Sequence, residues 1–296
     1  MSTFVAASAR GRSAIALIVA GVLWGTGGLS GNLLAAKAHL HPLPVAAYRL
    51  LLGGACTVLF VWATGRLRRV VWTKAVIRRL LVAGALLGQF QACYFLSVSL
   101  TSVSIATMIT IGSVPVFATL FTTIRDRRLP GTTTLVATAA AIAGLALLTW
   151  APVEGGWELL GGVAFALLAG AGFATLPLAT GKPVDGLDSF CTTAFGLLVG
   201  GLALAPAALW FGMALPLRLD VLAVALYFGL VPTGIAYAAY FLALRTAHPV
   251  LVALATLLEP LTAVVLSVIL FHDQLGVAGW CGAGLLVTAL AVSYTR

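Results

Sequence analysis

Two charged side chains lie deep inside apolar stretches of this sequence, Arg49 and Glu259. A guanidinium presents a planar fork of donors that can hold a carboxylate, and a carboxylate can hold a proton or a substrate amine. Each residue also has a structural interpretation. Arg49 could reach the nearby loop that contains His41, and Glu259 could bond backbone groups freed by Pro260. Both interpretations stay open, and the sequence does not show the two residues meeting.

Aromatic and amide residues occur in other apolar stretches at spacings that place them on shared helix faces. Gln91 and Tyr94 are three residues apart, and an internal repeat places Tyr237 and Tyr240 opposite them. Aromatic walls with a few polar contacts are the usual lining of a small-molecule site. Such a lining suits a solute with an apolar body and a zwitterionic head. The expected cavity residues are Trp24, Asn32, Tyr48, Arg49, Gln91, Tyr94, Thr110, Tyr237, Tyr240 and Glu259.

Other tryptophans have a different interpretation, because Trp and Tyr also form belts at the two bilayer interfaces. We expect this role for the tryptophans near the ends of the apolar stretches, Trp62, Trp72, Trp150, Trp157 and Trp210. For the deeper Trp24, Tyr94 and Tyr240, we expect a place in the cavity wall at least as readily as a place in a belt. Gly28, Pro115 and Pro260 are candidate hinges or kinks, because Gly and Pro weaken a helix. Close packing would favour the same glycine, so hinging is a hypothesis.

Several kinds of catalytic site can be set aside. The sequence contains no HExxH motif, and its four cysteines form no CxxC pair. Gly181-Lys182 lacks the first glycine and the Ser or Thr of a phosphate loop. We therefore expect no enzyme activity, no metal and no cofactor.

The elements that must position these side chains follow from the composition. Hydrophobic residues make up 61% of the 296 residues and charged residues only 8%, against roughly 25% in soluble proteins. A bilayer span needs about 20 apolar residues, and its backbone must be helical to satisfy its own hydrogen bonds. Ten stretches meet this length: 13–36, 43–64, 78–100, 102–124, 131–150, 157–180, 188–211, 220–244, 249–271 and 277–295. The sequence thus predicts an all-α integral membrane protein with ten transmembrane helices.

The net charge of +9 comes from basic residues in short loops, which argues against nucleic acid as a partner. If the N-terminus is cytoplasmic, nearly all Lys and Arg residues fall on the cytoplasmic side, and only Lys37 and Arg218 fall outside. We therefore expect a multi-pass protein of the inner (plasma) membrane with both termini in the cytoplasm. Its partners should be the lipid bilayer and a small-molecule substrate, and the chain should be a monomer or a homodimer.

The two halves of the chain resemble each other. Tyr94-Phe95-Leu96 matches Tyr240-Phe241-Leu242, and Gly53-Gly54 answers Gly200-Gly201. Five spans per half is an odd number, so the second half must be inverted relative to the first, as in many secondary transporters. The expected repeats are residues 1–150 and 151–296.

Short motifs link the chain to a known family. They are Leu23-Trp24-Gly25, Tyr48-Arg49, Pro115, Glu259-Pro260 and the acidic turn His272-Asp273-Gln274-Leu275. On these residues the chain resembles the EamA-type, ten-helix permeases of the drug/metabolite transporter superfamily. It is similar in particular to the aromatic amino acid exporters of that branch. One departure is Arg125-Asp126-Arg127-Arg128, where the family often carries a Gly-Glu-Arg-like turn; we interpret it as a loop that marks topology.

The resemblance implies a secondary transporter that exports amino acids, preferably aromatic or hydrophobic ones, from the cytoplasm by alternating access. Two alternatives stay open. The first is an exporter of cationic drugs or other metabolites, with Glu259 as the ammonium site. The second is a receptor or structural membrane subunit that moves no solute.

Overall fold

A computed structural model describes residues 2–127, 131–150, 156–180, 182–243, 249–272 and 276–294, and every named element in these ranges is helical. The first half of the chain contains α1 (Ser2–Ala38), α2 (Pro42–Ala63), the 3₁₀ turn η1 (Arg66–Arg69), α3 (Lys74–Leu100), α4 (Val103–Asp126) and α5 (Thr132–Trp150). The second half contains α6 (Gly156–Thr180), α7 (Ser189–Trp210), α8 (Leu219–Gly229), the π-helical turn η2 (Leu230–Ile235), α9 (Ala236–Ala243), α10 (Pro249–Phe271) and α11 (Val277–Tyr294).

Several helices begin at a polar side chain that caps them. Thr73, Ser102 and Asp188 each accept a hydrogen bond from the backbone N–H three residues later. His41 caps α2 through its imidazole, which accepts from the Leu43 N–H two residues later, and Pro42 and Pro44 lie in the first turn of that helix. These side chains satisfy N–H groups that have no partner within their own helix. The start of each of these helices is therefore encoded locally.

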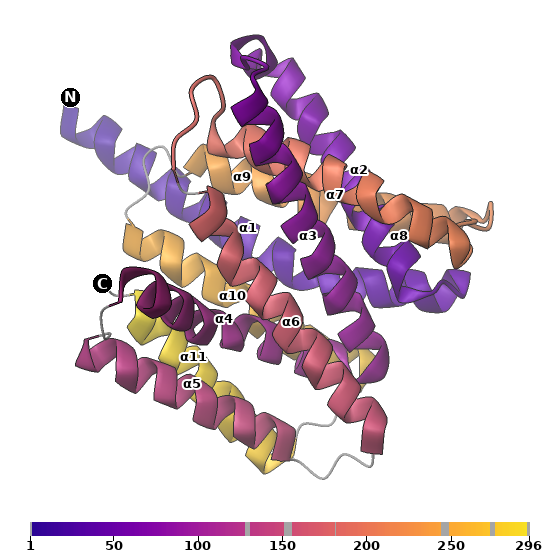
Figure 1. Cartoon of the computed structure of the whole chain (residues 1–296), viewed down its shortest axis with the longest axis vertical. Coiled ribbons are helices and arrows are strands. Elements are labelled where there is room, and N and C mark those ends of the chain that lie inside the picture. The colour runs from indigo at the N-terminus through magenta and orange to yellow at the C-terminus, as the bar shows by residue number, and fades with distance from the viewer. Residues whose placement is uncertain are drawn as a thin grey trace.

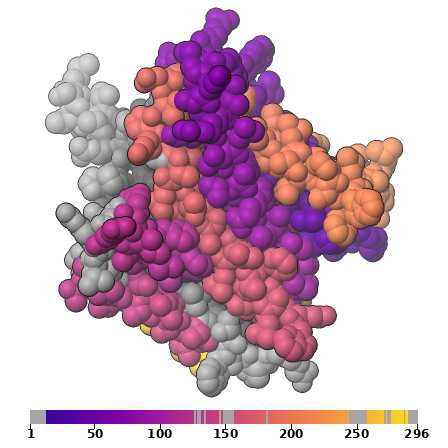
Figure 2. Space-filling model, in the orientation of Figure 1, coloured from indigo at the N-terminus to yellow at the C-terminus, as the bar shows by residue number. Residues whose placement is uncertain are grey.

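The helices pack into one bundle in which distant parts of the chain lie side by side (Figure 1). The most extensive contacts join α2 to α7, α5 to α11, α3 to α6 and α7, and α1 to α10. Figure 2 shows α3 and α6 next to each other on one face of the molecule. Small residues allow the closest approaches. A Cβ on Gly54 of α2 would lie 2.6 Å from the backbone nitrogen of Leu198 in α7.

The outside of the bundle is apolar, as a surface that faces lipid must be. Large hydrophobic side chains are exposed along several helices, including Leu59, Leu81, Leu168, Leu202 and Leu226. Seven helical segments are long and apolar enough to cross a membrane. They are Ser13–Ala38, Pro42–Ala63, Lys74–Leu100, Val103–Arg125, Gly156–Thr180, Ser189–Trp210 and Leu219–Tyr240. A multi-pass membrane protein is thereby supported, and spans at α5, α10 and α11 stay predictions.

The π-helical turn was not expected from the sequence, which predicted one uninterrupted helix over 220–244. Pro232 lies within this turn, and a proline removes a backbone donor and clashes with the preceding turn of a regular helix. The wider turn lets the chain continue in the same direction, so that α8, η2 and α9 follow one another. By contrast, α4 and α10 run as unbroken α-helices through Pro115 and Pro260.

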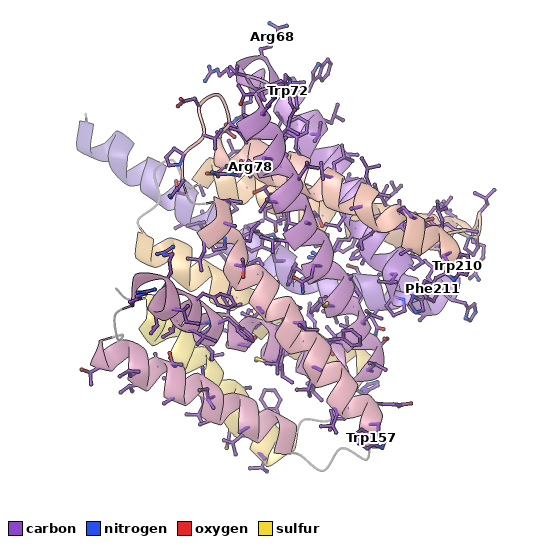
Figure 3. The ribbon with its side chains drawn as sticks, viewed as in Figure 1. Arg68, Trp72, Arg78, Trp157, Trp210 and Phe211 are labelled. Atoms are coloured by element: carbon purple, nitrogen blue, oxygen red, sulfur yellow. The ribbon has the colours of Figure 1, made fainter. Side chains whose placement is uncertain are left out.

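Tryptophans at helix ends are strongly exposed. Figure 3 shows Trp72 beside Arg68 at one end of the molecule and Trp157 at the opposite end. Trp157 and Trp210 are both 87% exposed. Exposed positions near span ends fit the expected interfacial belts. The side chain of Trp150, together with Arg128 and with Asp273, Gln274 and Leu275 of the acidic turn, lies outside the described residues.

Candidate functional site

A narrow cavity lies among α1, α2, α3, α4 and α10. The described residues that line it are Trp24, Gly25, Gly28, Arg49, Phe90, Tyr94, Thr107, Thr110, Ile111, Glu259 and Ala263. Its interior has about 10 Å³ of room for the centre of a water molecule, which corresponds to roughly one water. The cavity is therefore narrow, and a larger solute requires the surrounding helices or side chains to move.

Arg49 reaches the cavity from α2 and is only 7% exposed. One Nη donates a hydrogen bond of 3.4 Å to Oε1 of Gln91 on α3, and the guanidinium carbon lies 5.8 Å from the ring centre of Phe228. The guanidinium also packs against α1 at Gly27, where a Cβ would lie 2.5 Å from Nη2. These contacts hold the charge within the bundle. The structure thus places Arg49 at the cavity wall and not in the loop near His41.

Glu259 reaches the same cavity from α10, and Ala263, one turn later, lines it too. The helix face that carries Glu259 is held close to α1, because a Cβ on Gly25 would lie 2.5 Å from Cβ of Thr262. Among the salt bridges between described residues, none joins Glu259 to Arg49. The two opposite charges therefore share one cavity without forming a direct ion pair, and both can meet a solute.

Trp24 forms an aromatic wall of the cavity and is supported from behind by two tyrosines. Its ring centre lies 5.3 Å from that of Tyr237 and 5.0 Å from that of Tyr240, in edge and tilted arrangements that aromatic pairs favour. Within the described part of the chain, the indole Nε1 is buried and has no hydrogen-bond partner. Trp24 therefore offers an N–H donor as well as an apolar face.

Tyr94 and two threonines contribute hydroxyl groups that are already engaged. The Tyr94 hydroxyl and the Thr107 hydroxyl share a hydrogen bond of 2.8 Å, and the Thr110 hydroxyl donates to the backbone oxygen of Ala166 at 3.3 Å. Tyr94 is 6% exposed and packs against Phe90 at 6.2 Å between ring centres. These groups fix the shape of the cavity wall and leave the charged and indole groups as its principal polar contacts.

The structure brings together five of the ten expected cavity residues at the cavity wall, namely Trp24, Arg49, Tyr94, Thr110 and Glu259. Gly28, expected as a hinge, lines the cavity as well. Three more support this wall without lining it, because Gln91 bonds Arg49 and both Tyr237 and Tyr240 back Trp24. Tyr48 lies elsewhere, since its hydroxyl donates to the backbone oxygen of Met213 in the loop before α8. Asn32 is half-buried on α1 and is not among the described lining residues.

Four lining residues were not expected: Gly25, Phe90, Thr107 and Ile111. Helical spacing predicts Ala263, which lies four residues after Glu259 on the same stripe of its helix. The same spacing could have found Thr107, which lies three residues before Thr110. Gly25, Phe90 and Ile111 carry no polar group, so nothing separates them from ordinary packing residues in an apolar sequence. Among the described residues, no group of three or more His, Cys, Asp or Glu side chains could hold a metal ion.

Comparison with known proteins assigns the family. The model of the EamA-like transporter family matches residues 11–150 and again residues 160–295, which together make up most of the chain. This chain belongs to the EamA-like transporter family. The family is part of the drug/metabolite transporter superfamily, in agreement with the motifs around Trp24, Arg49 and Glu259.

Two relatives agree with this assignment. The chain is 31% identical over 280 residues to the uncharacterized transporter YwfM of Bacillus subtilis (strain 168), covering 93% of this chain and 91% of that protein. A solved structure described only as the crystal structure of a protein shares 19% of its residues and superposes with a TM-score of 0.63 over 97% of each chain. At that identity, the solved structure supports the fold alone. The family and the relative both indicate a transporter, and neither names a substrate.

Proposed function

We propose that this EamA-like transporter is a secondary transporter that exports amino acids, preferably aromatic or hydrophobic ones, from the cytoplasm. One observation carries the proposal: a buried cavity brings a guanidinium, a carboxylate and an indole ring together from three helices. An amino acid with an apolar side chain is complementary to this set, because it carries both charges and an apolar body. The residues assigned to substrate are Arg49, Glu259 and Trp24.

The proposed topology has ten spans arranged as two inverted repeats, residues 1–150 and 151–296. The helix packing supports it: α2 with α7 and α5 with α11 are the second and fifth spans of each half, and each packs extensively on its counterpart. The packing of α3 on α6 is matched by the packing of α8 and α9 on α1. The twofold match of the family model, once in each half, supports the same division.

In this proposal both termini are cytoplasmic and the protein lies in the inner membrane. The marked chain ends lie on the same side of the molecule in Figure 1, which supports an even number of spans. Since the cavity admits about one water molecule, transport requires the two halves to open it alternately to either side.

The proposal is tested by the flux of L-phenylalanine through the purified full chain in proteoliposomes, with and without a pH gradient. We expect wild-type flux to be saturable and Glu259→Gln to lose most of it, because the carboxylate that receives the ammonium or a proton is gone. If flux is the same with and without the gradient, Glu259 is not a coupling site. If no amino acid that is tested shows flux, with or without the gradient, the proposed function is wrong.

An exporter of cationic drugs is the alternative with some support, because Glu259 and aromatic rings share the cavity. However, Arg49 lines the same cavity and repels a cation. Competition separates the two possibilities: a cationic dye should inhibit phenylalanine flux weakly if the substrate is a zwitterion, and strongly if it is a cation.

A further inference from the structure

Two buried hydrogen-bond donors at the cavity have no partner among the described residues, Nε of Arg49 and Nε1 of Trp24. They come from different helices, α2 and α1, and both residues line the same cavity. Buried donors in proteins are nearly always satisfied, so an unsatisfied pair in one cavity requires an explanation. An acceptor that belongs to a bound solute would satisfy both donors.

Glu259 is the negative charge that the described lining offers to Arg49, and the two form no direct ion pair. Among the described residues, the guanidinium donates a hydrogen bond to the neutral amide oxygen of Gln91 at the long distance of 3.4 Å. The guanidinium of Arg49 otherwise faces the ring of Phe228 and the backbone of α1 at Gly27. Arg49 is 7% exposed, and a buried guanidinium without a directly paired anion is costly unless another group compensates its charge. The missing group is therefore an oxyanion.

The second charge in the cavity decides which oxyanion fits. Arg49 and Glu259 are the charged residues among the described lining residues, and their charges cancel. A phosphate would bring two negative charges toward Glu259 and meet a single guanidinium. A zwitterion pairs its carboxylate with Arg49 and its ammonium with Glu259, so that no charge is left unpaired at either end of the site.

We propose that Arg49 and Trp24 form the carboxylate-binding end of the cavity and that Glu259 receives the ammonium of the same α-amino acid. This inference rests on the proposed function and deepens it by assigning the orientation of the substrate. The apolar side chain of the substrate lies against Phe90, Ile111 and Ala263, which line the cavity and carry no polar side-chain group. Gly27 is a positioning residue, because only a residue without a Cβ leaves room for the guanidinium at α1.

The test compares three ligands on the full chain in detergent by isothermal titration. L-Phenylalanine carries both charges, its methyl ester lacks the carboxylate, and N-acetyl-L-phenylalanine lacks the ammonium. Wild type should bind the amino acid at least about tenfold more tightly than either derivative, because charge-assisted hydrogen bonds are lost at one end. This comparison needs no variant, so a folding defect cannot obscure it.

Conservative variants then locate each end. Trp24→Phe keeps an aromatic ring and removes the donor, and Arg49→Lys keeps the charge and removes the fork. Both should lower the preference for the amino acid over the ester several-fold and leave the binding of the ester nearly unchanged. Glu259→Gln should instead lower the preference for the amino acid over its N-acetyl derivative. The matched controls are Trp210→Phe, at a side chain that is 87% exposed, and Arg68→Lys, at an exposed residue. Both controls should bind like wild type.

The outcomes separate the two proposals. If wild type binds the ester as tightly as the amino acid, or if Trp24→Phe and Arg49→Lys weaken both ligands equally, the assigned orientation is wrong and amino acid transport still stands. If wild type binds none of the three ligands and moves no amino acid, both proposals are wrong.

Gly27→Ala should reduce the preference for the amino acid over its methyl ester, as Arg49→Lys does. Gly284→Ala is its control, because no atom lies within 4 Å of the added Cβ.

Discussion

Arg49 shows how a charged side chain is kept inside an apolar bundle. A neutral amide, an aromatic ring and a bare stretch of helix backbone surround its guanidinium, and each of these groups comes from a different helix. None of these three groups carries a negative charge, and among the described residues Glu259, at the same cavity, forms no direct ion pair with Arg49. The indole N–H of Trp24 is likewise buried and has no hydrogen-bond partner among the described residues.

His41 provides a prediction for pH dependence at the residue scale. Its imidazole accepts a hydrogen bond from the Leu43 N–H at the start of α2 and stacks on Phe211 with ring centres 4.0 Å apart. Burial lowers the pKa of His41 below its ordinary value of 6.5. Near that value the unfolded chain therefore binds more protons than the folded chain, and stability falls as the pH drops through this window.

The measurement compares thermal unfolding of wild type and His41→Asn in detergent between pH 8 and pH 5. Asn can cap α2 and does not titrate, and a lost cap costs about 1 kcal/mol. We expect similar melting temperatures at pH 8 and a larger decrease for wild type at pH 5. Parallel pH profiles for the two proteins would show that His41 does not contribute to the pH dependence.

Residue types alone could identify Arg49 and Glu259, because a charge inside a long apolar stretch is costly and conspicuous. Their meeting could not be predicted, since it depends on how α2 and α10 both approach α1. For the same reason, the sequence could not separate Gln91, which bonds Arg49, from a residue that lines the cavity. The positions of Tyr48 and Asn32 away from the described lining likewise follow from helix rotation, which motif spacing does not specify.

At the scale of elements, the helices were more predictable than their interruptions. Apolar length placed most helices to within a few residues, and caps such as Thr73 and Asp188 mark where α3 and α7 begin. The π-helical turn at Pro232 was missed, because a proline in an apolar stretch is compatible with a regular helix, a kink or a wider turn. Pro115 and Pro260 illustrate the difficulty, since both lie in helices that continue without a break.

The crossing of α2 and α7 gives a prediction for this scale. A Cβ at Gly54 would lie 2.6 Å from the Leu198 nitrogen and 2.8 Å from its Cα, so backbone would have to shift. Gly54→Ala should therefore destabilise the protein by about 1–3 kcal/mol, as overpacking does. Thermal unfolding in detergent measures the effect. Gly161→Ala is the matched control, because its nearest neighbour is a side-chain carbon 3.5 Å away and its melting temperature should be unchanged. Equal melting temperatures for both variants would contradict the close crossing.

At the scale of the whole molecule, the proposed topology predicts on which side of the membrane each loop lies. The basic turn η1 should lie on the cytoplasmic side and the loop before α8 on the outer side. Single cysteines at Arg68 and Leu217 report on these two places in a chain whose four native cysteines are replaced. Leu217 is 92% exposed and Arg68 is exposed, so both positions are open to a reagent.

A membrane-impermeant thiol reagent applied to intact cells should label Leu217→Cys and leave Arg68→Cys unlabelled. Inverted membrane vesicles should give the opposite pattern, because they present the cytoplasmic side to the reagent. Labelling of both positions from one side would exclude the ten-span topology. The pattern reversed in full would keep the number of spans and invert the orientation.

The narrowness of the cavity also affects how permeable a membrane that contains this protein becomes. A cavity whose described residues leave room for roughly one water molecule offers no continuous column of solvent along that wall. Passage of a larger solute therefore depends on collective helix motions, which take microseconds to seconds. A carrier of this kind turns over slowly compared with an open pore.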